Sequence, residues 1–539
     1  MLALERGKRY ALGSFPRTPH AMANNFWNTT IEKRSRPKAV AAIQQRGLFD
    51  VRNYKNIDVV LGAGLGGGSL IYANVFLEPP DDVFSDRWPK SCRKEQLQPY
   101  YKVCKEVLGA RPIPAMEGHR RILRTELFQN VARQIGRDSS LVDINVFFGN
   151  DFANPLAPGV QANNRYGALQ TSCVYCAECD IGCNYHAKNT LDLNYLHQAE
   201  RRYGAKIRTE QFVDRIVPVN ERGDDDPTAS GEHGYRVYYL NLAHHAEQHA
   251  IAKRVVVSSG SLGSTELLLR CRDVFHALTR IGGQLGQNFS GNGDFLGFVV
   301  GTRLPADPNY GPVITQRIDF NLFRGFDSDR AFILEDASYP AFGAWFVEGA
   351  KPGFLWLRSL WRTTRHWLAR LRGRTTGPIG YALHDLLSGD LSYHTCVLLS
   401  MGVDRSNGVM TLDRDGWLDL AWPTRDSRQL YDAIIAAGKQ FCRETNADFS
   451  CSMPTWWLPF RKNVSVHALG GCILSENPKE GVTSAAPATF GEVHGYKNLY
   501  VADGAIIPNA VGANPIATIS ALSELVAHGI TGMVPTADL

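Results

Sequence analysis

The stretch from residue 464 to residue 522 holds the densest set of residues that could do chemistry. His467 stands just before a glycine pair, and glycine lets a backbone approach a neighbouring group closely. Asp503 follows a short run of β-forming residues, and Asn514 precedes Pro515 and an apolar, helix-competent run. The order strand, acidic residue, loop and helix N-terminus is typical of a nucleotide cofactor site.

A helix that begins at Pro515 would place a partial positive charge beside that loop. Such a charge stabilises a nearby anion by about 0.3–1 kcal/mol, and a reduced flavin is such an anion. For either polar residue alone, the ordinary alternative is structural. His467 would then be a hydrogen-bonded core histidine, and Asn514 would be a helix cap.

These motifs resemble those of the glucose–methanol–choline (GMC) family of flavoproteins, and within it the cholesterol oxidase-like branch. The matching segments are H-A-L-G-G-C at 467–472, G-Y-K-N-L-Y-V at 495–501, D-G at 503–504 and G-A-N-P at 512–515. The departure is Ala468, where the branch usually has proline. So many fixed positions within about fifty residues are a specific signal, which favours functional roles for the histidine and the asparagine.

The resemblance implies FAD as the cofactor, with hydride passing from an alcohol carbon to flavin N5. It assigns His467 to the contact with the substrate hydroxyl and Asn514 to the orientation of substrate and ring. Glu335, in F-I-L-E-D-A-S-Y-P, aligns with a glutamate that moves a proton between carbons if a double-bond shift follows. For Glu335 the alternative of a solvated carboxylate at a strand end stays open.

The N-terminal residues predict part of a dinucleotide fold. Residues 1–5 resemble a strand that ends in an acid, Glu5, whose carboxylate binds the ribose hydroxyls of an adenosine. The strand, G-x-G-x-x-G turn and helix that should precede Glu5 are missing, so the sequence is expected to begin about thirty residues late. We therefore expect that the chain cannot hold the pyrophosphate in the usual way.

A second glycine-rich segment, G-A-G-L-G-G-G-S-L at 62–70, formally satisfies G-x-G-x-x-G, which is weak evidence by itself. Little helix-forming sequence follows it. It resembles instead the family's second flavin loop, with Asn74 substituting for an asparagine where Tyr72 stands. The resemblance assigns these residues to cofactor binding: Glu5, Gly66, Gly67, Gly68, Ser69, Asn74, Val213, Gly260, Asp503, Gly504, Asn514, Pro515 and Ile516.

Four of the eleven cysteines lie in the run C-V-Y-C-A-E-C-D-I-G-C. Cys173, Cys176, Cys179 and Cys183 have the spacing of a four-iron cluster, although the proline that usually follows is absent. A zinc site and free or structural thiols are the alternatives. The segment K-N-T-L-D-L-N-Y-L at 188–196 resembles a family segment that follows cysteines in relatives without an established cluster. It favours thiols, and hence no metal.

The chain is predicted to be an α/β protein. A Rossmann-like FAD-binding domain, truncated at its N-terminus, would be joined to an α+β substrate-binding domain with an antiparallel sheet. Within the FAD-binding segment 166–290, the residues around 212–219 and 235–242 predict two strands. The predicted segments are 1–80 (partial FAD-binding), 81–165 (substrate-covering), 166–290 (FAD-binding), 291–460 (substrate-binding) and 461–539 (FAD-binding, with the candidate histidine and asparagine).

The composition is ordinary for a globular protein, with 44% apolar and 21% charged residues. A net charge of +5 does not argue for nucleic acid, and no apolar run has the length of about eighteen residues that suggests a transmembrane helix. The N-terminus shows no secretory signal, and the odd cysteine count does not suggest a disulfide framework. Both observations favour the cytoplasm.

Residues 354–374 predict a basic amphipathic helix. Trp361 and Trp367 lie near its apolar face, and Arg358 and Arg365 are among the arginines on the other face. This composition is typical of an element that lies on a membrane surface, which would make the enzyme membrane-peripheral. The alternative is a helix that packs on the protein with a basic outer face.

The sequence therefore predicts an FAD-dependent oxidoreductase that acts on the CH–OH group of a sterol or another bulky hydrophobic alcohol. Two alternatives remain from the same residues. The first is an iron–sulfur electron-transfer flavoprotein, and the second is a catalytically inactive, truncated relative.

Purification of the chain with this start tests two of these expectations. We expect less than one flavin per chain in the absorbance spectrum, because the first phosphate-binding turn is missing. We expect no iron or acid-labile sulfide after anaerobic preparation, because thiols are favoured over a cluster. A yellow protein with stoichiometric flavin contradicts the first expectation, and stoichiometric iron contradicts the second.

Overall fold

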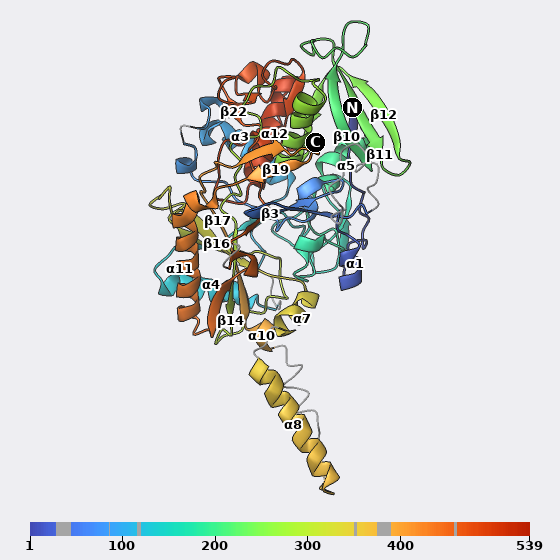
Figure 1. The fold of residues 1–539 in the computed structure, drawn as a ribbon. Helices are drawn as coiled ribbons and strands as arrows, with labels where there is room; N and C mark the ends of the chain where they lie inside the picture. Colours follow the sequence, from blue (N-terminus) through green and yellow to red (C-terminus); the bar gives the residue numbers. More distant parts are fainter. Residues whose placement is uncertain are drawn as a thin grey trace.

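Six antiparallel strands form the largest sheet of the molecule (Figure 1). The computed structural model describes residues 1–27, 45–85, 87–115, 120–349, 353–374, 390–457 and 461–538. In order across the sheet, the strands are β20 (Phe449–Ser452), β14 (Phe295–Val300), β17 (Thr395–Gly402), β16 (Phe332–Ala337), β15 (Gln316–Phe320) and β5 (Ser139–Leu141). An antiparallel sheet was predicted for the substrate-binding part, and the structure confirms it.

Helices α4 (Leu123–Gln134) and α11 (Arg428–Glu444) cover one face of this sheet. Successive side chains of a strand point to opposite faces. Asp336 of β16 points to the helices, where its carboxylate forms a buried ion pair with Arg124 of α4 (Oδ2 to Nε, 3.3 Å). Glu335 therefore points to the opposite face, away from α4 and α11.

The part predicted to bind FAD contains short parallel strands. Strand β1 (Leu2–Leu4) pairs with β9 (Lys206–Arg208), and β13 (Val255–Val257) pairs with β24 (Leu499–Val501). Helix α6 (Gly260–Leu269) begins shortly after β13, and α12 (Ile516–Thr531) follows β24 after a loop. The predicted strand before the acidic residue and the predicted C-terminal helix are both present.

A second set of paired strands brings two candidate segments together. Strand β3 (Ile57–Gly62) pairs antiparallel with β2 (Phe49–Asn53) and parallel with β21 (Asn463–Ser465). The carboxyl ends of parallel neighbours meet at one edge of a sheet. The glycine-rich loop that follows β3 and His467, which follows β21, therefore leave the sheet on the same side.

The predicted antiparallel strands near residues 212–219 and 235–242 are confirmed as β10 (Gln211–Pro218) and β11 (Tyr235–Asn241), with β12 (Ala246–Ala252) completing the sheet. The other elements are α1 (Pro19–Ala23), β4 (Val75–Phe76), α3 (Lys94–Val107), β6 (Asp143–Ile144), β7 (Gln161–Asn163), β8 (Leu169–Thr171), α5 (Tyr195–Arg201), α7 (Ala341–Gly349), α8 (Gly353–Leu371), α10 (Asp390–Tyr393), β18 (Val409–Leu412), β19 (Leu418–Ala421), β22 (Leu474–Ser475) and β23 (Thr483–Ser484).

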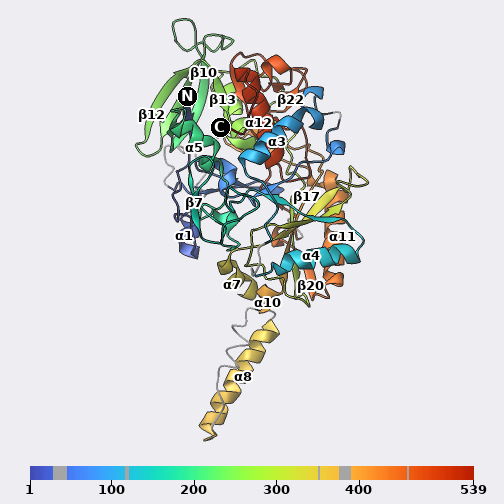
Figure 2. The same ribbon diagram turned by 180° about the vertical axis from the view of Figure 1, so that it is seen from behind.

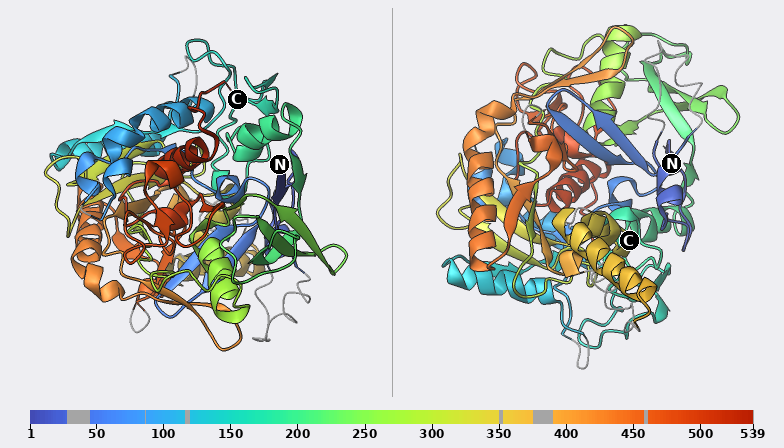
Figure 3. Two further views of the ribbon diagram at one scale, coloured as in Figure 1. Left: turned by 90° about the horizontal axis from the view of Figure 1, so that it is seen from above. Right: turned by 60° about the horizontal axis from the view of Figure 1, so that its bottom comes forward.

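Helix α12, the dark red ribbon near the centre of both views of Figure 3, buries one face, which includes Ala517, Thr518 and Ala521. It packs against α3, where the hydroxyl of Tyr101 lies 2.9 Å from Oγ1 of Thr518. Its first turn is buried, and Asn514 immediately before it is 5% exposed. The predicted cofactor loop therefore ends inside the protein rather than at its surface.

Helix α8 projects away from the rest of the molecule (Figures 1 and 2). Leu360, Trp361, Trp367 and Leu371 are each about 60% exposed or more. The alternative in which this helix packs along the protein is therefore wrong for the described residues. Among those residues, no helix combines the length and apolar character needed to cross a bilayer.

Candidate functional site

His467 is held by the carboxylate of Asp294, which the sequence analysis did not identify. The imidazole Nδ1 lies 2.7 Å from Asp294 Oδ1, and Oδ2 accepts the Ser465 hydroxyl and the backbone N–H of Val466, both at 2.9 Å. A carboxylate only accepts, so Nδ1 carries the hydrogen and Nε2 of the neutral ring is left as an acceptor. Asp294 thus fixes both the orientation and the tautomer of His467.

A short turn that ends at Asp294 places this carboxylate. Gly293 has a φ of +63°, and a Cβ there would lie 2.5 Å from the carbonyl oxygen of Gly402. Only glycine fits such a position. The buried carboxylate of Asp404 accepts the N–H of Gly293 at 3.0 Å and the hydroxyl of Ser290 at 2.9 Å. The turn is therefore anchored at both ends.

The same turn holds the loop that presents Asn514. The side-chain oxygen of buried Asn292 accepts the backbone N–H groups of Val511 and Gly512 at 3.0 and 2.9 Å. Its side-chain nitrogen donates to the next carbonyl along the loop at 2.8 Å. Because Asn292 stands two residues before Asp294, one turn sets the positions of both predicted side chains.

Asn514 donates through Nδ2 to Oε2 of Glu335 at 3.2 Å and does not cap α12. The helix-cap alternative for Asn514 is therefore wrong. Glu335 is completely buried, so the alternative of a solvated carboxylate is wrong as well. Burial raises the pKa of Glu335 to about 8, and the hydrogen bond from Asn514 opposes this only in part. The carboxyl is mostly protonated at neutral pH.

The glycine-rich loop after β3 leaves open space beside its backbone. Gly66 has a φ of +112°, and a Cβ on Gly67 or Gly68 would meet nothing within 4 Å. The hydroxyl of Ser69 closes the turn by donating to the Gly66 carbonyl at 2.7 Å. A 3-10 turn, Gly67–Leu70, follows in place of the α-helix of a Rossmann unit, as the sequence predicts.

A buried lysine ties this loop to the cysteine run. Lys188 Nζ donates to the carbonyl oxygens of Leu70, Tyr72 and Cys179 at 2.9, 3.1 and 2.8 Å. These bonds use all three N–H donors of the ammonium group. Burial lowers the pKa of Lys188 to about 8. No sequence motif specifies this role of Lys188, because the three acceptors are backbone carbonyls.

Several buried polar atoms near these elements have no hydrogen-bond partner within the described part of the chain. They are both side-chain amide atoms of Asn74, Oδ1 of Asn514 and Oε1 of Glu335. Such atoms are rare in folded proteins because they cost free energy. A flavin ring carries polar atoms that could satisfy them, so Asn74 and Asn514 fit the predicted cofactor contacts, while Glu335 was predicted as a catalytic residue.

Asp503 joins two of the elements assigned to the cofactor. Its buried carboxylate accepts the N–H of Gly260 at 2.9 Å and the N–H of Ala505 at 2.8 Å. Gly504 begins the 3-10 turn that follows, Pro515 precedes α12, and Ile516 is the first residue of that helix. Asp503 therefore has a structural role, and its predicted contact with the cofactor stays a prediction.

Glu5 follows a parallel strand, and Val213 lies in an antiparallel one. Glu5 follows β1, and its Oε1 accepts the N–H of Gly7 at 2.6 Å. Val213 lies in β10, and its carbonyl accepts from Nη2 of Arg270 at 3.2 Å. Both backbones are fixed by the chain itself, while their assigned contacts with adenosine remain predictions.

The glycine pair after His467 does approach something closely, as predicted, and the neighbour is the chain itself. A Cβ on Gly470 would lie 2.1 Å from the carbonyl oxygen of Asn288, and a Cβ on Gly471 would lie 2.2 Å from Oγ1 of Thr265. The pair therefore serves backbone packing beneath the site. It does not by itself indicate a cofactor contact.

The four clustered cysteines form no disulfide and line one small cavity of about 20 Å³. That volume is close to the space of a single water molecule, which is too small for a four-iron cluster. Burial raises the pKa of Cys176 to about 12 and that of Cys179 to about 11, so these thiols stay protonated. In the ranges that the structure describes, no three histidine, cysteine or acidic side chains are placed to hold one metal ion.

The described residues thus hold a histidine–carboxylate pair, a buried amide–carboxyl pair and an open glycine-rich loop. Groups of these kinds could move protons beside a dinucleotide cofactor. Two family models, both described as GMC oxidoreductase, match residues 40–288 and 420–523. The chain belongs to the GMC oxidoreductase family, a family of FAD-dependent oxidoreductases.

Named relatives cover almost the whole chain. It is 25% identical to a cholesterol oxidase of Acinetobacter baumannii over 97% of its own length and 88% of that protein. It is also 25% identical to a cholesterol oxidase of Mycobacterium tuberculosis, over 97% of its own length and 85% of that protein. At this identity the likeness supports the family, and the substrate is a separate question.

Solved structures share the fold. A pyridoxine 4-oxidase superposes with a TM-score of 0.58 at 14% identity, covering 99% of this chain and 94% of that one. A fungal aryl-alcohol oxidase superposes with a TM-score of 0.55, again at 14% identity, with coverage of 98% and 94%. The α/β architecture predicted from the sequence, with an FAD-binding part and a substrate-binding part, is confirmed.

Replacing Glu335 by glutamine tests whether its carboxyl is protonated. The folded pKa of about 8 exceeds the ordinary value of 4.5, so the folded state binds more protons than the unfolded state between these values. We expect wild type to lose stability relative to the Glu335→Gln variant as the pH rises from about 4.5 to 8, by about 3–5 kcal/mol. Urea unfolding across this range measures the difference, and a constant difference contradicts the raised pKa.

Proposed function

We propose that this chain is an FAD-dependent oxidoreductase that oxidises the CH–OH group of a sterol or a similarly bulky hydrophobic alcohol. The observation that carries the proposal is the His467–Asp294 pair beside the Asn514–Glu335 pair. The first pair supplies an oriented acceptor for a substrate hydroxyl, and the second supplies buried polar groups with unused hydrogen-bonding capacity. FAD, when bound, supplies the acceptor for the hydride that leaves the alcohol carbon.

In this mechanism His467 accepts the hydrogen bond, and then the proton, of the substrate hydroxyl at Nε2. Asp294 holds the ring through Nδ1 and stabilises the imidazolium that forms. Asn514 keeps Oδ1 available for the substrate or the ring, because its Nδ2 is engaged by Glu335. Its position before the first turn of α12 also puts the partial positive charge of that helix near the reaction.

Glu335 is suited to proton transfer because its pKa of about 8 lies close to neutral pH. We assign to Glu335 the transfer of a proton between two substrate carbons. This transfer shifts a double bond into conjugation with the new carbonyl. A carboxyl of ordinary pKa would be ionised there and could accept but not return a proton as readily. This role applies only to substrates with a suitably placed double bond.

The apolar character of the proposed substrate rests on the sheet and on the relatives. Leu399 of β17 lies directly opposite Glu335, and Leu296 of β14 lies opposite Leu399, so all three side chains share one sheet face. The two leucines suit a largely hydrophobic molecule, and Arg317 of β15, which also lies opposite Glu335, adds one charged group to this face. The two relatives described as cholesterol oxidases support the same substrate class.

The domain boundaries predicted from the sequence are part of this proposal.

We also propose that α8 docks the enzyme on a lipid surface. Its tryptophans 361 and 367 are exposed to 59% and 61%, and the helix carries no acidic residue. A basic helix with interfacial aromatic side chains gains free energy at an anionic bilayer. Docking there would bring the enzyme to a substrate that dissolves in membranes.

Replacing His467 by alanine tests the proposed base. With FAD supplied, we expect kcat to fall by about 100-fold or more, because the acceptor for the hydroxyl proton is lost. His494→Ala is the matched control, since that part-buried histidine bonds a backbone carbonyl of the same C-terminal segment. Steady-state rates with a sterol and flavin absorbance are measured together. Near-native turnover of the His467→Ala variant with flavin bound removes His467 from this role.

Flotation with anionic liposomes tests the role of α8. We expect the chain to float with the vesicles and a variant that lacks residues 354–374 to stay at the bottom of the gradient. Trp361→Gln combined with Trp367→Gln should weaken flotation while the arginines are kept. Equal partitioning of the chain and the deletion variant would end this part of the proposal.

A further inference from the structure

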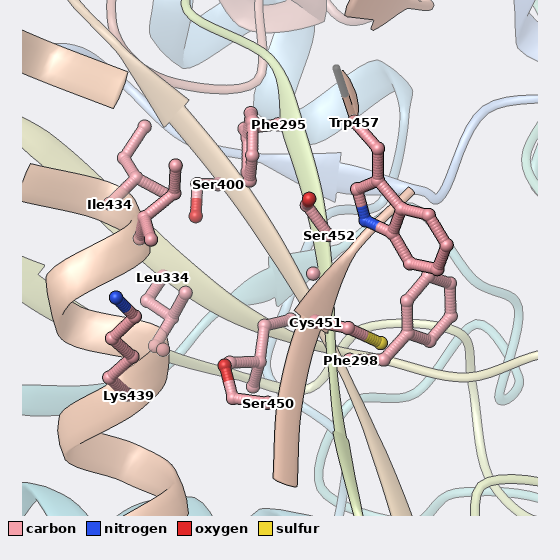
Figure 4. Close-up of a pocket in the computed structure, with 14 residues that line it drawn as sticks. Phe295, Phe298, Leu334, Ser400, Ile434, Lys439, Ser450, Cys451, Ser452 and Trp457 are labelled. Carbon is pink, nitrogen blue, oxygen red and sulfur yellow. The ribbon is translucent and has the colours of Figure 1, made fainter. Parts of the chain in front are cut away.

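A second cavity lies on the opposite face of the six-stranded sheet from Glu335. Its volume is about 320 Å³, and strands β14, β17 and β20 form one wall while α11 forms the other (Figure 4). Leu334 lines it, and the next residue along β16 is Glu335. Neighbouring residues of a strand face opposite sides, so the sheet separates this cavity from the candidate catalytic residues. Its size lies at the lower end of the range for ligand sites, roughly 300–1,000 Å³.

Two glycines on facing walls keep this cavity open. Gly438 lies in the middle of α11 and Gly297 lies in β14, and neither has a positive φ. A Cβ on Gly438 would come no closer than 3.4 Å to Oγ of Ser450, and a Cβ on Gly297 no closer than 3.7 Å to the Cys451 carbonyl. Glycine is less stable than alanine within a helix or strand. Neither the backbone conformation nor the available space requires glycine at these two positions. The two glycines therefore lower the stability of the fold and preserve the volume of the cavity.

The walls are apolar, with one buried polar atom left over. Phe295, Leu398 and Ile434 line the interior, and Trp457, which is half-exposed, lines the side that opens to solvent. The hydroxyl of Ser400 is completely buried and has no hydrogen-bond partner within the described residues. A ligand with a polar atom at that point would satisfy it.

Lys439 supplies the positive charge at this cavity. It is the residue after Gly438, lines the cavity and is exposed, with no acidic partner among the described side chains. Figure 4 shows its amine on the α11 side, beyond Leu334 and Ile434. An apolar cavity with an exposed ammonium group at its edge is complementary to a molecule with a hydrophobic body and an anionic head.

We propose that this cavity is a binding site for an anionic amphiphile, such as an alkyl carboxylate, separate from the alcohol site. The alkyl body would lie between the sheet and α11, and the carboxylate would pair with Lys439. This site is separate from the proposed oxidation chemistry, because Leu334, Leu398 and Ile434 place the cavity interior on the α11 side of the sheet, opposite Glu335.

Titration calorimetry with decanoate tests the proposal on the full chain. We expect saturable binding at one site per chain. In the Gly438→Leu variant the new side chain fills the cavity. The affinity for decanoate should fall by at least about tenfold, because the alkyl chain can no longer be buried there. Gly438→Ala is the matched control, because a single Cβ fits at 3.4 Å, and it should bind decanoate nearly as well as wild type. A wild type without binding, or equal binding by Gly438→Leu and wild type, overturns the proposal.

Two further variants separate this site from the alcohol site and test the head group. Lys439→Met should lower the affinity for decanoate about two- to fivefold, which is the contribution of a partly exposed ion pair. It should leave the affinity for decanol unchanged. His467→Ala should bind decanoate like wild type. Loss of decanoate binding in His467→Ala with retention in Gly438→Leu would assign the ligand to the alcohol site and contradict this proposal.

Discussion

The carboxylate of Asp294 is the group on which the candidate site depends most. It accepts hydrogen bonds from the imidazole of His467, from the backbone beside it and from Ser465. The turn that carries it also carries Asn292, which holds the loop before Asn514. A shift of this turn would move the histidine and the asparagine together. Such coupling suits a site whose two polar side chains must keep a fixed spacing.

The six-stranded sheet places two neighbouring acids in different environments. Asp336 faces α4 and pairs with Arg124, while Glu335 faces the other way, where Asn514 donates to it and Arg317 of β15 lies opposite. A paired carboxylate and an unpaired, buried one therefore differ by a single step along β16. Burial raises the pKa of Glu335 to about 8, because the hydrogen bond from Asn514 and the charge of Arg317 offset only part of the desolvation.

On the other side of the site, Lys188 joins the glycine-rich loop to the cysteine run by three bonds to carbonyl oxygens. The run therefore supports the loop predicted to contact the flavin. The four thiols line a cavity near the size of one water molecule, and burial raises the pKa of Cys176 and Cys179. That this four-cysteine run holds thiols and no cluster stays a prediction.

The sequence alone determined the family motifs, the strand before Asp503, the helix after Pro515 and the identity of His467 and Asn514 as candidate site residues. These follow from local patterns, because turn glycines, β-rich runs and helix starts are encoded over a few neighbouring positions. Only the tertiary structure revealed Asp294 beside His467, Lys188 beneath the glycine-rich loop, and the burial of Glu335. The physical reason is distance along the chain: Asp294 and His467 are 173 residues apart, and their hydrogen bond exists only once the sheets and the α12 loop have packed.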